Sequence, residues 1–224
     1  MESVKESLDE SGLVCVGTQD DISEFRRANI DKIMARNLLW QGNHVCAAIA
    51  IPQDREWIQQ WSLYLNAISK KFRKNGLVFE IHPLFPSLAV SSVSTDNITL
   101  LDMLLKQLDD DILIQPDFFH IFMSKTDPVN FIEKYRSRIF EAHFKDCRIL
   151  EGGLDMIPSS SFDALKYFPL TPVGQGVIPW KTIIEACIKH GVEYCWAEQE
   201  EWDKDAFECM KESFDYLAGC GLEA

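Results

Sequence analysis

The stretch RIFEAHFKDC, residues 138–147, decides how the rest of the chain is interpreted. A β-like run ends here in His143, Lys145 and Asp146. Successive side chains of a strand point to opposite faces, so we expect His143 and Lys145 on one face and Phe144 on the other. Two interpretations are open: a strand that delivers polar side chains to a metal or substrate, or the polar end of a core strand.

The same pattern, a short apolar run followed by an amphipathic helix, recurs six times. The predicted strands are 12–19, 44–51, 77–82, 111–117, 138–144 and 193–200. The predicted helices are 21–40, 54–76, 99–109, 128–137, 179–191 and 205–220. Nearly continuous apolar strands alternating with amphipathic helices indicate a parallel sheet covered by helices. An open doubly wound sheet and a closed β/α barrel both fit this order, and we predict a single domain over residues 1–224.

Composition narrows the class of protein. The chain has 224 residues and a net charge of −13, which argues against binding to nucleic acid or to anionic membranes. No apolar run reaches the ~20 residues of a membrane span. Its seven cysteines are scattered without a CxxC pair, as expected of reduced thiols. Neither GxGxxG after the first strand nor GxxxxGK[ST] occurs. These features predict a soluble, cytoplasmic protein without a nucleotide-binding fingerprint.

Ionisable residues mark the ends of four successive predicted strands. These residues are His82, Asp117, His143 and Glu198. In a parallel β/α sheet such ends lie on one side, and in a barrel they surround a single mouth. Their nitrogen and oxygen donors suit a divalent cation. Glu80, two residues before His82, shares its face and is an alternative ligand. The competing explanation is that strand ends are polar simply because they meet solvent.

Other polar residues near the predicted strand ends give weaker signals. His120 follows Asp117 by three residues, and it either faces a substrate or packs among neighbouring phenylalanines. We interpret His44 and His190 as structural. Glu200, like the glutamate that follows it, is expected to lie in a solvated turn.

Three stretches together resemble the xylose-isomerase-like β/α-barrel superfamily: RSRIFEAHFKD, TPVGQGVIPWKTIIEACIKHGVEYCWAEQE and DAFECMKESFDYL. The superfamily includes sugar and sugar-phosphate isomerases and epimerases, inosose dehydratases and endonuclease IV. The likeness runs from about residue 12 to 219. It implies a TIM barrel in which the six units correspond to strands three to eight, so the barrel is expected to be incomplete. A homodimer would cover the gap.

The resemblance also implies roles for individual residues. Asp117, His143 and Glu198 would ligate the metal, and His82 would stand where the isomerases place a fourth ligand, a glutamate. Lys145 would contact the bound sugar, and His120 would be substrate-facing. Glu198 and His82 are the expected catalytic residues. Because an imidazole replaces one glutamate, the resemblance does not imply the exchange of a proton between two matched glutamates.

The function expected from the resemblance is a metal-dependent isomerase or epimerase of a sugar, sugar phosphate or inosose. A bound Mn, Co, Zn or Mg ion would stabilise the charge that develops when a proton is removed next to a carbonyl. The alternatives are a sugar-binding homologue without activity and an inosose-type dehydratase. A DNA-repair nuclease fits poorly, because a multi-zinc cluster needs more ligands than five histidines readily supply.

Overall fold

The computed structural model describes residues 1–94, 96, 98–153 and 161–223. These residues form two compact units, and each is described by itself. The first unit comprises Met1–Pro83 and Val90–Ile114, and the second comprises Leu84–Ala89 and Gln115–Ala224.

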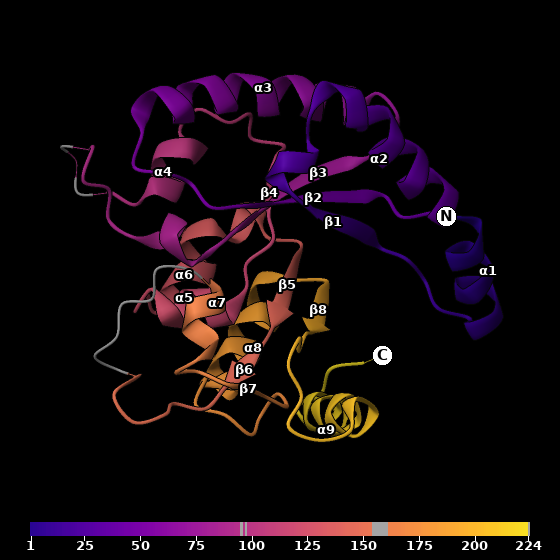
Figure 1. Ribbon diagram of the computed structural model, residues 1–224, viewed down its shortest axis with the longest axis vertical. Helices are drawn as coiled ribbons and strands as arrows, with labels where there is room; N and C mark the ends of the chain where they lie inside the picture. Colours follow the sequence, from indigo (N-terminus) through magenta and orange to yellow (C-terminus); the bar gives the residue numbers. More distant parts are fainter. Residues whose placement is uncertain (95, 97, 154–160, 224) are drawn as a thin grey trace. The chain divides into compact units, whose positions relative to one another are not determined.

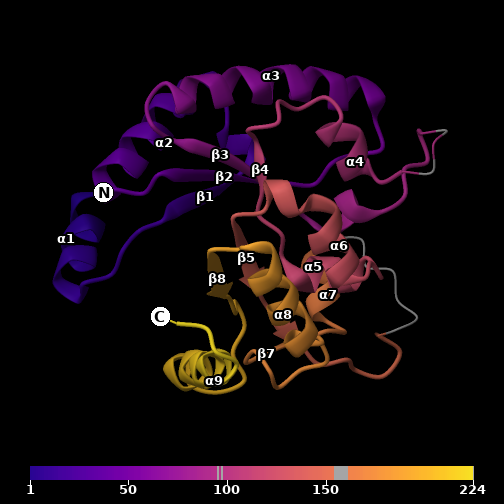
Figure 2. The same cartoon turned by 180° about the vertical axis from the view of Figure 1, so that it is seen from behind.

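The first unit is built on a parallel sheet with the strand order β1-β2-β3-β4. The strands are β1 (Gly17–Asp21), β2 (His44–Ile49), β3 (Val78–Pro83) and β4 (Leu113–Ile114). The helical segments are α1 (Glu2–Ser11), η1 (Ile22–Glu24), α2 (Arg27–Trp40), α3 (Arg55–Arg73) and α4 (Leu100–Leu105). Figures 1 and 2 show α2 and α3 on the same face of this sheet. The predicted sequence of strands and helices is therefore present in this unit.

Helix α3 shows why these residues form a helix against the sheet. Asp54 caps its start by accepting hydrogen bonds from the backbone N–H groups of Glu56 and Trp57. Three basic residues, Lys70, Lys71 and Arg73, lie in its last turn, where they interact favourably with the helix dipole. Its buried face carries Ile58, Leu65, Ile68 and Phe72. Burial of this apolar stripe holds α3 on the sheet.

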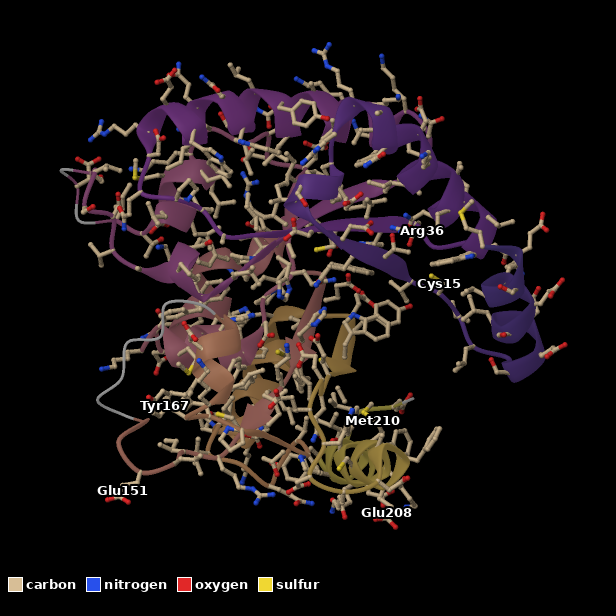
Figure 3. All side chains as sticks on the ribbon, viewed as in Figure 1. Cys15, Arg36, Glu151, Tyr167, Glu208 and Met210 are labelled. Carbon is tan, nitrogen blue, oxygen red and sulfur yellow. The ribbon has the colours of Figure 1, made fainter. Side chains whose placement is uncertain are left out.

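Several predicted boundaries in the first unit differ from the structure. The predicted strand 111–117 is shortened to β4, and the predicted helix 99–109 is shortened to α4. The predicted strand 12–19 begins later, at Gly17, and Leu13 and Val14 are exposed. The predicted helix 21–40 is divided, because Asp21 caps the short η1 and the extended Arg26 separates it from α2. Arg36 of α2, which is labelled in Figure 3, donates hydrogen bonds to Thr18 and Asp20 of β1.

The second unit contains two pairs of strands. β5 (Glu141–Phe144) and β8 (Tyr194–Ala197) are parallel, whereas β6 (Asp146–Cys147) and β7 (Leu170–Thr171) are antiparallel. Its helical segments are η2 (Phe85–Leu88), α5 (Phe118–Met123), α6 (Pro128–Tyr135), η3 (Arg136–Arg138), α7 (Ser161–Leu165), α8 (Trp180–His190) and α9 (Ala206–Gly219). Helix α5 and the β6–β7 pair were not expected from the sequence.

The core of the second unit confirms the predicted alternation in β5. The ring of Phe144 stacks on Trp180 of α8, with 4.8 Å between ring centroids, and meets Phe118 at 5.5 Å. Phe144 is fully buried in this aromatic cluster. His143 and Lys145 therefore point away from α8, as alternation along a strand requires.

Candidate metal and substrate site

Three of the four predicted metal ligands come together in the second unit. Asp117 forms a parallel β-bridge with His143, supported by a 2.8 Å hydrogen bond from the His143 N–H to the Pro116 carbonyl. Glu198 follows β8, and its N–H donates to the carbonyl of Phe144 at 3.1 Å. Backbone hydrogen bonds thus place the three side chains on adjacent segments. One ligand atom from each lies within 4.8 Å of the others.

Hydrogen bonding and charge couple these three residues. His143 Nδ1 and Glu198 Oε2 are hydrogen-bonded. Burial acts to lower the pKa of His143, but this hydrogen bond and the charges of Glu198 and Asp117 outweigh it and raise the pKa. Burial likewise acts to raise the pKa of Glu198, but His143 and Lys145 hold it at about 2. A metal ion would bind the neutral form of the His143 ring, so it would compete with the proton that Glu198 and Asp117 favour there.

Lys145 lies at the centre of the acidic groups. Its Nζ is 2.7 Å from Glu200 Oε1, 3.2 Å from Asp117 Oδ2 and 3.4 Å from Glu198 Oε1. Burial acts to lower its pKa, but the three carboxylates raise it above the usual value. Lys145 is thus a buried ammonium. Glu200, expected to lie in a solvated turn, is 52% exposed, and its carboxylate also contacts Lys145. Its spacing of two residues from Glu198 is the sequence signal that points to this contact.

His120 also lies near the triad. Its Nε2 is 3.7 Å from Asp117 Oδ2, and its side chain is buried. Burial lowers its pKa, so the ring is neutral at pH 7. Asp117 itself caps α5 by accepting the N–H of Phe119 at 2.7 Å, which fixes both the aspartate and the helix that carries His120.

His82 and Glu80 belong to the first unit. His82 is buried near the end of β3, and its role as a fourth ligand remains a prediction. Glu80 accepts a hydrogen bond from His44 Nδ1 at 2.5 Å, and both side chains are buried. The interpretation of His44 as structural agrees with this pair, which connects β2 to β3.

A second polar layer lies two positions before the three ligands on their own segments. Glu141 is buried and accepts hydrogen bonds from the side chains of Gln115 and, at 2.7 Å, Trp196. Gln115 precedes Asp117 by two residues, Glu141 precedes His143, and Trp196 precedes Glu198. Alternation along extended segments puts each on the face of its ligand. This layer, which was not predicted from the sequence, connects the segments that carry the triad.

The triad suits a divalent cation. It offers two carboxylates and one imidazole, a donor set that Zn²⁺, Mn²⁺ and Co²⁺ accept. The three ligand atoms converge from separate segments, and Asp117 is buried. In the described part of the chain, the residues present therefore fit a metal with three protein ligands and open positions for substrate.

The fold is that of the xylose isomerase-like TIM barrels, as comparison with solved structures shows. A sugar phosphate isomerase/epimerase from Parabacteroides distasonis matches with a TM-score of 0.74 and 17% identity, covering 96% of this chain and 74% of that one. The probable 3-DHS dehydratase AsbF from Bacillus anthracis matches at 0.71 and 15%, covering 97% and 82%. The IolI protein, solved with a bound zinc atom, matches at 0.68 and 13%, covering 97% and 81%.

These matches confirm the resemblance drawn from the sequence at the level of the fold. No protein-family model matches the chain, and no curated protein sequence matches it. In the parts of the chain that the structure describes, no helix is both long enough and apolar enough to cross a membrane.

Proposed function

We propose that the protein is a divalent-metal-dependent isomerase or epimerase of a small sugar or sugar phosphate that acts by removing a proton next to a carbonyl. The observation that carries this proposal is the convergence of Asp117, His143 and Glu198, whose ligand atoms lie within 4.8 Å of one another. Support comes from the similar structures, among which are sugar phosphate isomerase/epimerases and a zinc-containing protein. In TIM-barrel enzymes the active site lies at the C-terminal ends of the strands.

Asp117, His143 and Glu198 would hold the metal ion, and His82 is the proposed fourth ligand. When bound, the ion supplies a Lewis acid that polarises the substrate carbonyl. Glu198 is the proposed proton acceptor, because its low pKa keeps the carboxylate ionised at neutral pH and its side chain is 30% exposed.

The remaining groups bind and orient the substrate. The Lys145 ammonium is placed to donate hydrogen bonds to a substrate hydroxyl and to oppose negative charge on the carbonyl oxygen. His120, which is neutral because burial lowers its pKa, is the proposed contact for a second hydroxyl. His82 is the proposed second acid/base.

The test is exchange of substrate protons with solvent. The protein, loaded with Mn²⁺ in D₂O, is incubated with a panel of ketoses, aldoses, sugar phosphates and inososes, and NMR follows deuterium at the carbon next to the carbonyl. We expect exchange with wild type and its loss in Glu198→Gln. The matched control is Glu193→Gln, an exposed glutamate before β8 that should retain exchange.

The same spectra separate the alternatives. Isomerisation or epimerisation gives a product of unchanged composition, whereas dehydration gives a product that has lost water. Sugar binding without exchange in wild type would contradict the enzymatic proposal and favour a binding homologue.

We also propose that the protein forms a homodimer through α9 and β8. Three apolar residues on α9 are exposed: Phe207 (86%), Met210 (36%) and Phe214 (53%). Figure 3 shows Met210 and Glu208 on opposite sides of α9. Among the described residues, β8 pairs only with β5, which leaves an open strand edge. Light scattering at micromolar concentration should give twice the monomer mass, and Phe207→Glu should restore the monomer; a monomeric wild type would contradict the proposal.

A further inference from the structure

Lys145 contacts the proposed metal ligands directly in the structure. Its ammonium touches two of the three proposed ligands, Asp117 at 3.2 Å and Glu198 at 3.4 Å. Its side chain is only 6% exposed, so water screens these contacts weakly. Lys145 thus provides positive charge beside the same two carboxylates that a divalent cation would use.

The two carboxylates explain why the metal-free site needs the positive charge of Lys145. The side chain of Asp117 is fully buried, and that of Glu198 is 30% exposed. Two carboxylates brought together in a buried site repel each other unless a positive charge lies between them. The Lys145 ammonium meets both, so it offsets their repulsion and favours the arrangement seen in the triad.

The same ammonium must oppose a bound metal ion. A dication held by Asp117, His143 and Glu198 would share Asp117 and Glu198 with Lys145, and the two positive centres would repel each other. For the metal to bind well, the ammonium needs another acceptor. Glu200 is that acceptor, since its 2.7 Å contact is the shortest of the three, and its carboxylate, 52% exposed, is not part of the triad.

We propose that Lys145 is an internal counter-ion that keeps Asp117 and Glu198 together in the metal-free protein, and that Glu200 retains Lys145 when a divalent cation takes over those two carboxylates. Glu200 is then a positioning residue: it acts on metal affinity through Lys145. This inference rests on the metal site of the proposed function, but it concerns binding rather than turnover.

The experiment is a double-mutant cycle on metal affinity, with wild type, Lys145→Met, Glu200→Gln and the double variant. Each protein is stripped with a chelator, and Mn²⁺ binding is measured from the electron paramagnetic resonance signal of free Mn²⁺. Mn²⁺ is chosen because it prefers oxygen and nitrogen ligands to thiolates, and the chain has seven cysteines. Thermal unfolding of the metal-free proteins is the second readout. Glu201→Gln, one position away and exposed, is the matched control.

The expected pattern has opposite signs. Lys145→Met lowers the metal-free unfolding temperature but tightens Mn²⁺ binding about tenfold, since it removes a competing charge. Glu200→Gln weakens Mn²⁺ binding about tenfold and leaves metal-free unfolding nearly unchanged. In the Lys145→Met background, Glu200→Gln has an effect of less than about twofold. Glu201→Gln changes neither quantity.

Several results would overturn the inference. If Glu200→Gln weakens Mn²⁺ binding equally with and without Lys145, Glu200 does not act through the lysine. If stripped wild type binds no Mn²⁺, both this inference and the metal site of the proposed function fall. If it binds Mn²⁺ and the cycle shows no coupling, only the role of Lys145 and Glu200 falls. Should Lys145→Met not fold, Glu200→Gln alone decides: unchanged Mn²⁺ affinity overturns the inference.

Discussion

The buried carboxylate of Asp146 accepts a hydrogen bond from the backbone N–H of Gly176 at 2.9 Å. The same carboxylate accepts the N–H groups of Gly174 at 3.0 Å, Cys147 at 2.8 Å and Ile178 at 3.3 Å. The loop 173–178 therefore wraps around the Asp146 carboxylate. Asp146 follows Lys145 directly, so this contact anchors the end of the segment that carries the site.

Gly176→Ala is expected to destabilise the protein by about 1–3 kcal/mol. A Cβ at this position would overlap the Asp146 carboxylate and the Cys147 carbonyl. Urea denaturation of the metal-free protein measures the change in the free energy of unfolding. The matched control is Gly219→Ala at the end of α9, where a Cβ meets no atom within 4 Å. Equal stability of the two variants would contradict the prediction.

Asp146→Asn is expected to cost about 3 kcal/mol, although the two side chains have nearly the same shape. One of the two oxygens becomes an NH₂ group, which cannot accept the N–H groups that now point at it. Urea denaturation is again the measurement. Asp215→Asn, in an exposed ion pair with Lys211, should change stability by less than about 1 kcal/mol. A similar effect in both variants would argue against the anchoring role of Asp146.

His143→Ala is expected to lower the affinity for divalent metal at least about 100-fold, because it removes one of three protein ligands. The measurement is the metal content of protein purified and dialysed with Mn²⁺ or Zn²⁺, by elemental analysis. The control is His190→Ala, at the end of α8, which should retain wild-type metal content. Full metal content in the His143 variant would remove this residue from the ligand set.

Cys147 is expected to make stability depend on pH in the alkaline range. Burial, with smaller contributions from Asp146 and Asp117, raises the pKa of its thiol from 9.0 to about 12. The folded state therefore favours the neutral thiol, and the stability it contributes is complete below pH 9 and is lost as pH rises toward about 12. At pH 10.5 the loss is about 2 kcal/mol.

The check is the difference in the free energy of unfolding between wild type and Cys147→Ala at pH 8 and at pH 10.5, since other titrating groups cancel. Between pH 8 and pH 10.5, we expect the free energy of unfolding of wild type to fall by about 2 kcal/mol relative to that of Cys147→Ala. A thiol-alkylating reagent at pH 8 should also leave Cys147 unmodified until urea is added. A constant difference, or rapid alkylation in the folded state, would contradict the assignment.

The sequence by itself determined the local pattern of this protein. Apolar strands followed by amphipathic helices predicted the β/α order, and two-residue alternation separated His143 and Lys145 from Phe144. Both are consequences of backbone geometry, which acts over a few residues and can be followed along the chain. The positions of Asp117, His143 and Glu198 near strand ends were predicted for the same reason.

Only the tertiary structure decided which distant groups meet these residues. Lys145 and Glu200 are 55 positions apart and share a hydrogen bond, as do Glu141 and Trp196. Spacing along the chain indicates the face on which each glutamate lies, but it does not indicate the partner of either one. Their partners are set by the pairing of β5 with β8, a long-range contact whose register depends on the packing of the whole unit. Charge pairing in a buried site is thus a property of the fold, whereas the face on which each side chain lies is a property of the strand.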